Sequence, residues 1–194
     1  KSASKKSRGI LGKACIIHTS NEKMATKEAN RVNHILPDSI MLSDPSKKEV
    51  VQYTKKADIV HVIAHQSRGK IYFNKYEYET NEFLKLISGP KNLVVMSVCG
   101  SGVSNYRQPP IEHKSIAHHI IQNNNSAVIS HNWDLSQSSS FRFSDSFYNS
   151  LVKKNSIMES FGISLEKLIN ISPAMYGGYM LWGNAITSYQ KKLN

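Results

Sequence analysis

Short apolar runs of strand length alternate along this chain with segments in which apolar residues recur at helical spacing. The strand-length runs are residues 14–17, 40–42, 58–65, 93–98, 127–130 and 179–182. The helical spacing falls within residues 25–36, 46–53, 80–87, 116–121, 141–152 and 163–169. Near-continuous apolar strands are buried on both faces, which requires helices on each side of a parallel sheet. The alternation predicts an α/β fold, a three-layer α/β/α sandwich with a mostly parallel central sheet.

Local signals place several boundaries within this pattern. Ser46 and Glu49 have the spacing of a capping box and predict the start of a helix that continues through Tyr53. Residues 67–80 contain Gly69 between aromatic and polar residues, which favours a small hairpin or a loop. We expect the strand of residues 58–65 to end near His65.

Size and composition narrow the class of protein. The 194 residues, 40% of them hydrophobic, suit one globular domain. The longest apolar run, residues 93–98, is far too short to cross a bilayer. Cys15 and Cys99 are the only cysteines, too few for a disulfide framework, so we favour free thiols over a bond between them. We expect a soluble protein of the reducing cytoplasm.

The chain begins with a basic stretch, in which no apolar segment of signal-peptide form follows the lysines. We expect residues 1–9 to be a linker, residues 10–194 to be the domain, and the whole to be part of a longer protein. The formal net charge is +11, yet the lysines are scattered and no RNA-binding motif is present. Solvated surface charge is therefore favoured over direct nucleic-acid binding, although a complex could carry a nucleic acid through another subunit.

Two side chains with catalytic potential stand at predicted strand ends. His65 closes one apolar run, and Cys99 directly follows another, just before Gly100. The carboxyl ends of parallel strands open onto the binding edge of such sheets. A thiol beside small residues, with an imidazole as its base, suits a nucleophile, and the amide of Cys99 could point at an oxyanion. This pairing requires that the two strands be neighbours.

Other interpretations of these residues remain open. Cys99 could simply cap a core strand, and Cys15 is expected to be core packing because its neighbours are apolar. His61 and His65 would form a metal pair if their segment were helical, but its β-branched composition favours a strand. On a strand, His61 would share a face with His65, either as a satisfied buried histidine or as a group that orients the site.

Motifs for other chemistries are incomplete. A zinc site could use His113, His118 and His119, but only Glu112 has suitable spacing to complete it, so a surface helix is favoured. The Gly-Ser-Gly after Cys99 lacks the lysine of a phosphate loop, and no serine-hydrolase elbow is present. We expect neither a metal nor another cofactor.

Two segments resemble a known family. Residues 57–66, ADIVHVIAHQ, and residues 92–102, NLVVMSVCGSG, are similar to the active-site blocks of CHAT domains, caspase-like peptidases related to separase and more distantly to caspases and gingipains. The resemblance continues in order from residue 10 to residue 183. Its weaker parts are a strand ending at Trp133, a helix around residues 147–151 and a closing strand at residues 179–183.

The resemblance implies a caspase-like sandwich in which His65 is the catalytic histidine and Cys99 the nucleophile. The family usually has glycine where this chain has Gln66, so the oxyanion contacts would come from the backbone of Gln66 and of Gly100. The family often has an acidic residue at the position of Gln137, while here Asp134 follows the tryptophan. Both are candidates for a substrate pocket.

These observations predict a cysteine endopeptidase that acts on protein substrates and is restrained by a regulatory domain or an activating partner. The alternative is a scaffold with the same fold that has lost catalysis and retains only an interaction role. The departure at Gln66 keeps that alternative open.

Overall fold

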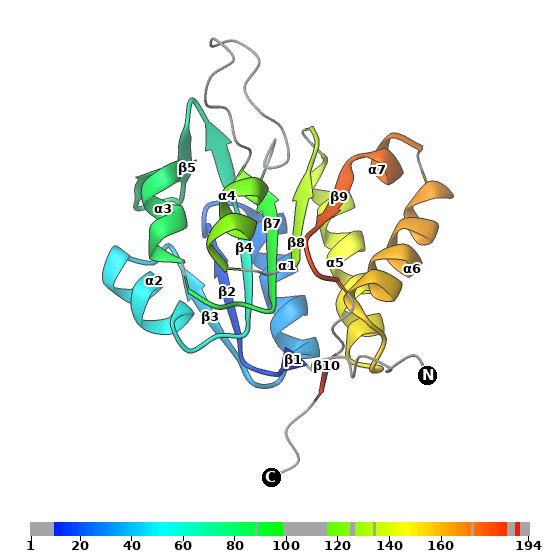
Figure 1. Ribbon diagram of the computed structural model, residues 1–194. Helices are drawn as coiled ribbons and strands as arrows, with labels where there is room; N and C mark the ends of the chain where they lie inside the picture. Colours follow the sequence, from blue (N-terminus) through cyan, green and yellow to red (C-terminus); the bar gives the residue numbers. More distant parts are fainter. Residues whose placement is uncertain are drawn as a thin grey trace.

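A central sheet with helices on both faces makes up the protein (Figure 1). The computed structural model describes residues 10–87, 89–98, 116–124, 127–133, 135–171, 173–185 and 189–190. The main strands are β2 (Ala14–His18), β3 (Ser39–Ser43), β4 (Ile59–Ser67), β7 (Leu93–Val98), β8 (Ala127–His131) and β9 (Tyr179–Trp182). They lie in the order β3-β2-β4-β7-β8-β9, in which β9 runs antiparallel to β8 and the other pairs are parallel. The predicted mostly parallel sheet is confirmed.

Each face of the sheet buries its own hydrophobic core. The helices that cover one face are α1 (Lys23–Ile35), α5 (Gln137–Leu151) and α6 (Ile157–Ile169), and those that cover the other are α2 (Lys47–Thr54), α3 (Thr80–Leu86) and α4 (Ile116–Asn124). Within β4, Ile59 and Ile63 face the first core, while Val60 and Val62 face the second. This alternation follows from the period of two along a strand and confirms the three-layer sandwich.

The strand β4 is longer than predicted. It passes His65 and continues to Ser67, where it turns into an antiparallel extension formed by β5 (Lys70–Tyr72) and β6 (Glu77–Glu79). Arg68 and Gly69, the two residues of the turn, both have positive φ angles of 49° and 78°. Such a turn follows the twist of the strands it joins, and glycine adopts the second position without strain. The predicted hairpin in residues 67–80 is thus confirmed.

Two helices begin earlier than their apolar spacing predicted. The predicted helix at residues 141–152 begins at Gln137, where the Ser136 side chain accepts a hydrogen bond from the Ser139 amide. The predicted helix at residues 163–169 begins at Ile157, after a capping box made by Ser156 and Glu159. In both cases the first turns are held by polar caps, which an apolar period does not reveal. The capping box predicted at Ser46 and Glu49 is confirmed.

A short helix and a separate pair of strands complete the described chain. The short helix α7 (Pro173–Gly177), which was not predicted, precedes β9, and the strands β1 (Ile10–Leu11) and β10 (Tyr189–Gln190) form a separate parallel pair. None of the described helices combines the length and apolar composition needed to cross a bilayer.

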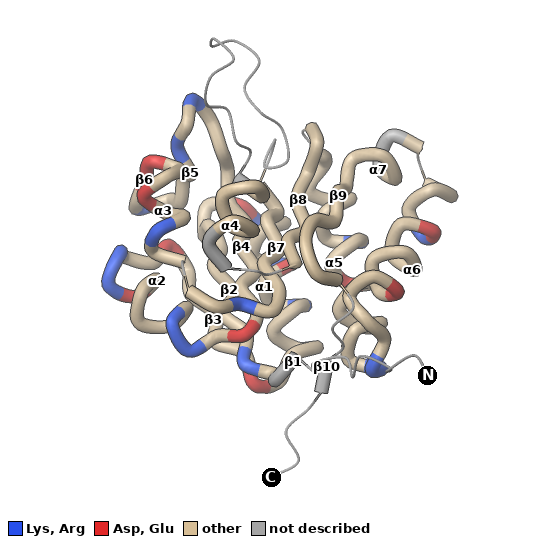
Figure 2. Tube along the Cα trace, viewed as in Figure 1, with Lys and Arg blue, Asp and Glu red and all other residues tan. Residues whose placement is uncertain are grey.

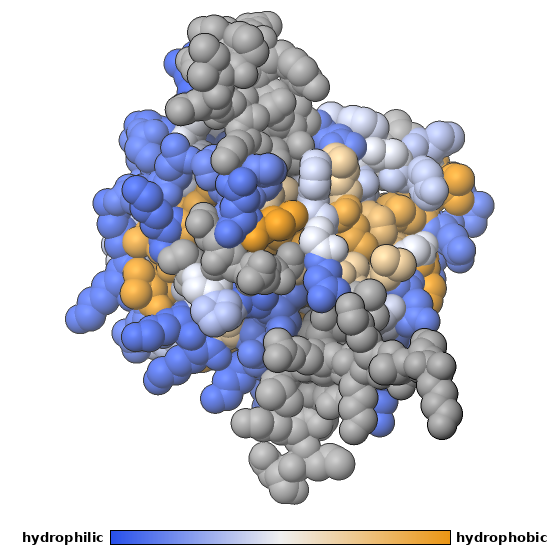
Figure 3. Space-filling model, in the orientation of Figure 1, coloured by the Kyte–Doolittle hydropathy of each residue, from blue (hydrophilic) through white to orange (hydrophobic). Residues whose placement is uncertain are grey.

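The surface of the sandwich is charged on one side and partly apolar on the other. Lys and Arg are spread over α2, α3 and the β5–β6 hairpin, with Asp and Glu among them (Figure 2). Hydrophilic side chains dominate that region, whereas apolar ones reach the surface around β9 and α6 (Figure 3). The mixture of signs agrees with the prediction of scattered surface charge.

Candidate active site

The strands that carry the two predicted catalytic positions are neighbours. β4 pairs with β7 in parallel register, with Ile63 opposite Ser97 and Ala64 opposite Val98. His65 follows Ala64 in the chain, just as Cys99 follows Val98. The adjacency that the pairing required is confirmed, and the strand at residues 59–67 excludes the helical metal pair of His61 and His65. Cys99, Gly100 and Asp134 lie outside the described residues, as does His113.

His65 is accessible and is held by a carboxylate. Its side chain is 48% exposed, and its Nε2 contacts Oε1 of Glu22. The other carboxylate oxygen of Glu22 accepts a hydrogen bond from Nε2 of Gln137. Glu22 is the N-cap residue of α1 and Gln137 is the first residue of α5, so two helix starts converge on this histidine. A carboxylate on one ring nitrogen orients an imidazole and determines its tautomer.

Gln66 presents its side chain to the opposite face of the strand from His65, because side chains alternate along a strand. It pairs with Ile71 across the antiparallel extension, and its Oε1 is buried with no hydrogen-bond partner among the described residues. The side chain of Gln66 therefore contributes nothing to the surroundings of the imidazole. Only its backbone remains a candidate for the oxyanion contact.

A buried polar cluster lies next to this histidine on the same face of the sheet. Oε1 of Glu28, in α1, lies 3.2 Å from Nε2 of His61 and accepts hydrogen bonds from Ser97 at 3.0 Å and Ser144 at 2.7 Å. Ser97 is also 3.0 Å from His61 and receives a bond from Ser140 at 3.1 Å. His61 is buried, as predicted, and its Nε2 has partners, whereas its Nδ1 has no hydrogen-bond partner among the described residues.

The carboxylate of Glu28 stays ionised although its side chain is only 2% exposed. Burial opposes the charged form, but the hydrogen bond and the charge of His61, with the hydroxyls of Ser144 and Ser140, outweigh it and hold the pKa of Glu28 below its usual value. Burial also raises the pKa of Tyr148 well above its usual value, and its ring stacks on His61 with centroids 5.5 Å apart. The cluster is thus a fixed negative charge with bonded partners.

A small cavity joins the accessible histidine to this cluster. It has a volume of about 40 Å³, roughly the space of one water molecule. Its lining includes Glu22, Glu28, His65, Ser97, His131 and Gln137. Residues from α1, β4, β7, β8 and α5 therefore meet around this cavity, at the carboxyl edge of the sheet.

The sequence interpretation missed both glutamates of this site. Glu28 falls on the apolar stripe of α1 between Ala25, Ala29 and Val32, and a carboxylate at such a position signals a buried partner. Glu22 carries no comparable signal, because nothing in a single sequence indicates that a helix start will lie beside a particular strand end.

The remaining candidates do not contribute to this site. Cys15 is buried and free, and burial raises the pKa of its thiol to about 12, with the nearby charge of Lys91 opposing. It is core packing, as predicted. His118 and His119 lie on α4, which covers the other face of the sheet. No group of three potential metal ligands occurs within the part of the chain that the structure describes.

Comparisons with known proteins identify the fold. No family model and no curated protein matches the sequence. Three solved structures are similar. The complex of the pro- and mature domains of Porphyromonas gingivalis RgpB has a TM-score of 0.67 and 16% identity, covering 92% of this chain and 50% of that one. The Saccharomyces cerevisiae separase–securin complex has a TM-score of 0.68 and 12% identity over 94% of this chain. A further protease has a TM-score of 0.64 and 11% identity over 95% of it.

This chain spans 50% and 49% of the RgpB and third protease chains, and 13% of the separase chain. At such low identity the likeness concerns the fold alone, which is the caspase-like α/β sandwich that these structures share. The predicted fold class is confirmed.

Proposed function

We propose that this chain is a cysteine endopeptidase domain in which Cys99 is the nucleophile and His65 its proton acceptor. The observation that carries the proposal is the parallel register of β4 and β7, which sets Val98, directly before Cys99, opposite Ala64, directly before His65. The caspase-like neighbours support a peptidase-related fold. The closer assignment to CHAT domains rests on the two sequence blocks around His65 and Cys99.

In this mechanism the imidazole of His65 accepts the thiol proton, and the thiolate attacks the carbonyl carbon of the scissile peptide bond. The tetrahedral intermediate collapses with cleavage of the C–N bond, and the imidazolium returns its proton to the leaving amine. Water, deprotonated by the same imidazole, then attacks the thioester and releases the carboxylic acid and the thiol. Backbone amides of Gln66 and Gly100 would stabilise the oxyanion in both steps.

Glu22 acts as a positioning residue. Its carboxylate engages Nε2 of His65, which leaves Nδ1 as the nitrogen that exchanges protons with the thiol and with the substrate. Gln137 restrains the second oxygen of that carboxylate. In this role Gln137 acts through Glu22, while direct contact of Gln137 or Asp134 with the substrate remains a prediction.

The proposed activity requires restraint, and we expect a regulatory segment or partner protein to provide it. The similar structures include one with a pro-domain and one with securin, which supports this expectation. The proposed setting is the cytoplasm, with a protein substrate, no cofactor and no direct contact with nucleic acid or membrane.

The deciding experiment compares new protein termini in a cell lysate after incubation with the wild-type protein and with Cys99→Ala, each in its full-length form with its partners. The expected result is a set of termini that depends on Cys99 and is also lost in His65→Ala. Identical termini with wild type and Cys99→Ala under activating conditions would refute the peptidase and favour the scaffold.

A further inference from the structure

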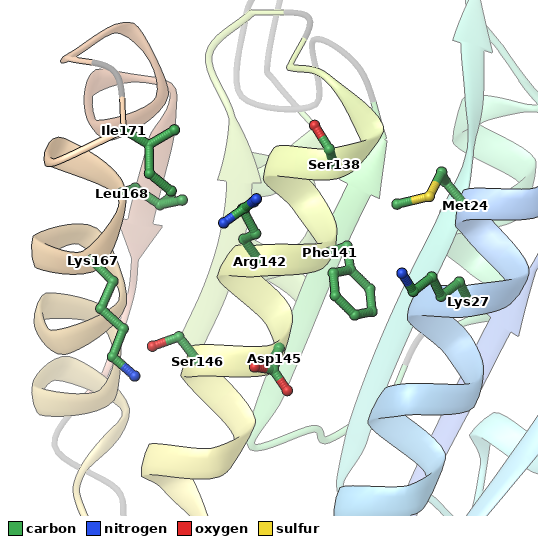
Figure 4. A pocket seen from close by; sticks show the side chains of 10 residues that line it. All are labelled: Met24, Lys27, Ser138, Phe141, Arg142, Asp145, Ser146, Lys167, Leu168 and Ile171. Atoms are coloured by element: carbon green, nitrogen blue, oxygen red, sulfur yellow. The ribbon is translucent and has the colours of Figure 1, made fainter.

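A second hollow lies on the outer face of the helical layer formed by α1, α5 and α6. It has a volume of about 510 Å³, within the range of ligand sites. In Figure 4 the side chains that line it come from α5 in the centre, from α1 on one side, and from α6 and Ile171 just after it on the other. We call it the α5 groove.

The α5 groove carries three cations that no acidic partner neutralises within the described residues. They are Lys27, Arg142 and Lys167, one from each helix, and all three are exposed. Lys27 lies 4.8 Å from the centroid of the Phe141 ring, and no ion pair of the described chain includes any of the three.

The one carboxylate in the α5 groove is committed elsewhere. Asp145 accepts a hydrogen bond from Nε of Arg31 at 2.5 Å and another from Asn149 at 3.0 Å. Its charge is therefore balanced outside the groove, and the groove retains a net positive potential. Ser146, buried beside Lys167, adds a hydroxyl that has no hydrogen-bond partner among the described residues.

Apolar side chains complete the lining. Met24 and Phe141 are partly buried, Leu168 is buried, and Ile171 is 48% exposed at the rim. The exposed Ile171 lies beside cations that form no ion pair within the described residues. A ligand with both apolar and negative groups would therefore bind this surface more favourably than a ligand with only one of them. A nucleic acid would use the cations but would leave the exposed Ile171 without an apolar partner.

Residues that line the α5 groove are close in sequence to residues of the candidate active site. Glu22, which holds His65, is two residues before Met24, and Gln137, which holds Glu22, directly precedes Ser138 of the groove lining. Part of the groove lining, Met24 and Ser138, therefore belongs to the same first turns of α1 and α5 that lie beside His65.

From this charge, apolar lining and location, we infer that the α5 groove binds an acidic segment of a partner protein that also presents leucine-like side chains. This goes beyond the proposed peptidase activity and does not depend on Cys99. The net charge of +11 agrees with a preference for acidic partners.

The test measures the fluorescence anisotropy of a short labelled peptide that alternates glutamate pairs with leucine, using the full-length protein. The charge-reversed double variant Arg142→Glu/Lys167→Glu should lose affinity by about tenfold or more, because two attractive contacts become repulsive. The control is Lys48→Glu/Lys56→Glu, which makes the same change in net charge at exposed positions on and just after α2. It should bind like the wild type.

Three results would overturn the inference: equal affinity of the two double variants, equal binding of a polyglutamate peptide without leucine, or tighter binding of a single-stranded RNA that the groove variant alone loses. Cys99→Ala should bind the peptide as the wild type does, so failure of the peptidase proposal and failure of this one are distinguishable. Circular dichroism melting of each variant checks that its fold is retained.

Discussion

Replacing Glu28 by Gln is expected to destabilise the protein through the loss of a single buried charge. Gln keeps the size of the side chain and one acceptor oxygen, but it turns three contacts, with His61, Ser97 and Ser144, from charge-assisted into neutral ones. Hydrogen bonds to charged groups contribute about 1.5–3 kcal/mol and neutral ones about 0.5–1.5 kcal/mol. The difference, roughly 1 kcal/mol per contact, predicts a loss of about 2–4 kcal/mol in the free energy of unfolding.

Glu28→Ala should cost more, about 3–5 kcal/mol, since it removes the carboxylate that His61 contacts and leaves the buried Ser144 hydroxyl without its acceptor. The exposed Glu166→Gln is the matched control and should change stability by less than about 0.5 kcal/mol. Urea unfolding at neutral pH, followed by circular dichroism, measures all three. A loss below about 0.5 kcal/mol for Glu28→Gln would refute the view that the charge holds this cluster together.

The same substitution has a defined pH dependence. The pKa of Glu28 is lower in the folded state than its ordinary value of 4.5, so the unfolded chain takes up the proton first as the pH falls. The stability from the carboxylate is therefore fully present above about pH 5 and is lost as the pH falls below 4.5 towards the folded pKa. The gap in stability between wild type and Glu28→Gln should narrow as the pH falls below 4.5. A gap that widens in acid would contradict the sign of the shift.

Three further outcomes follow from the site and the core. Glu22→Gln should lower kcat by about tenfold or more with a smaller effect on KM, because it loosens the orientation of His65. Glu22→Asp should recover part of that loss. Equal kcat values for Glu22→Gln and the wild type would exclude a positioning role for Glu22. Iodoacetamide at pH 8 should label Cys99 in the folded protein but spare Cys15, whose pKa is raised by burial to about 12, whereas unfolded protein should take up label at both; mass spectrometry reads this out. Phe147→Ala, in the core between the sheet and α5, should cost about 3–5 kcal/mol in urea unfolding, and a loss under 1 kcal/mol would show that the core is not packed as described.

The sequence alone determined the layers of this protein and the positions of its central strands, although β4 runs on past His65 to Ser67. Residues 58–65 and 93–98 are apolar at nearly every position. Such a strand must be buried on both faces, which requires a helical layer on each side of a parallel sheet. The strands, the type of sheet and the sandwich could therefore be predicted from composition and period. Cys99 and His65 could be chosen because each lies at the end of such a run. Where polar caps rather than apolar period hold a helix, as at Ser136 and Ser156, the boundaries were placed too late.

Only the tertiary structure decided what surrounds the histidine. Glu22 and His65 are 43 residues apart in sequence, and Glu22 and Gln137 are 115 apart. Neither contact therefore produces a periodic or local pattern in the sequence. Glu28 was visible as a carboxylate on an apolar stripe, but its partners Ser97 and Ser144 come from a strand and a helix that only folding brings together. Local propensity and period are properties of neighbouring residues, whereas a site is made by the packing of distant ones.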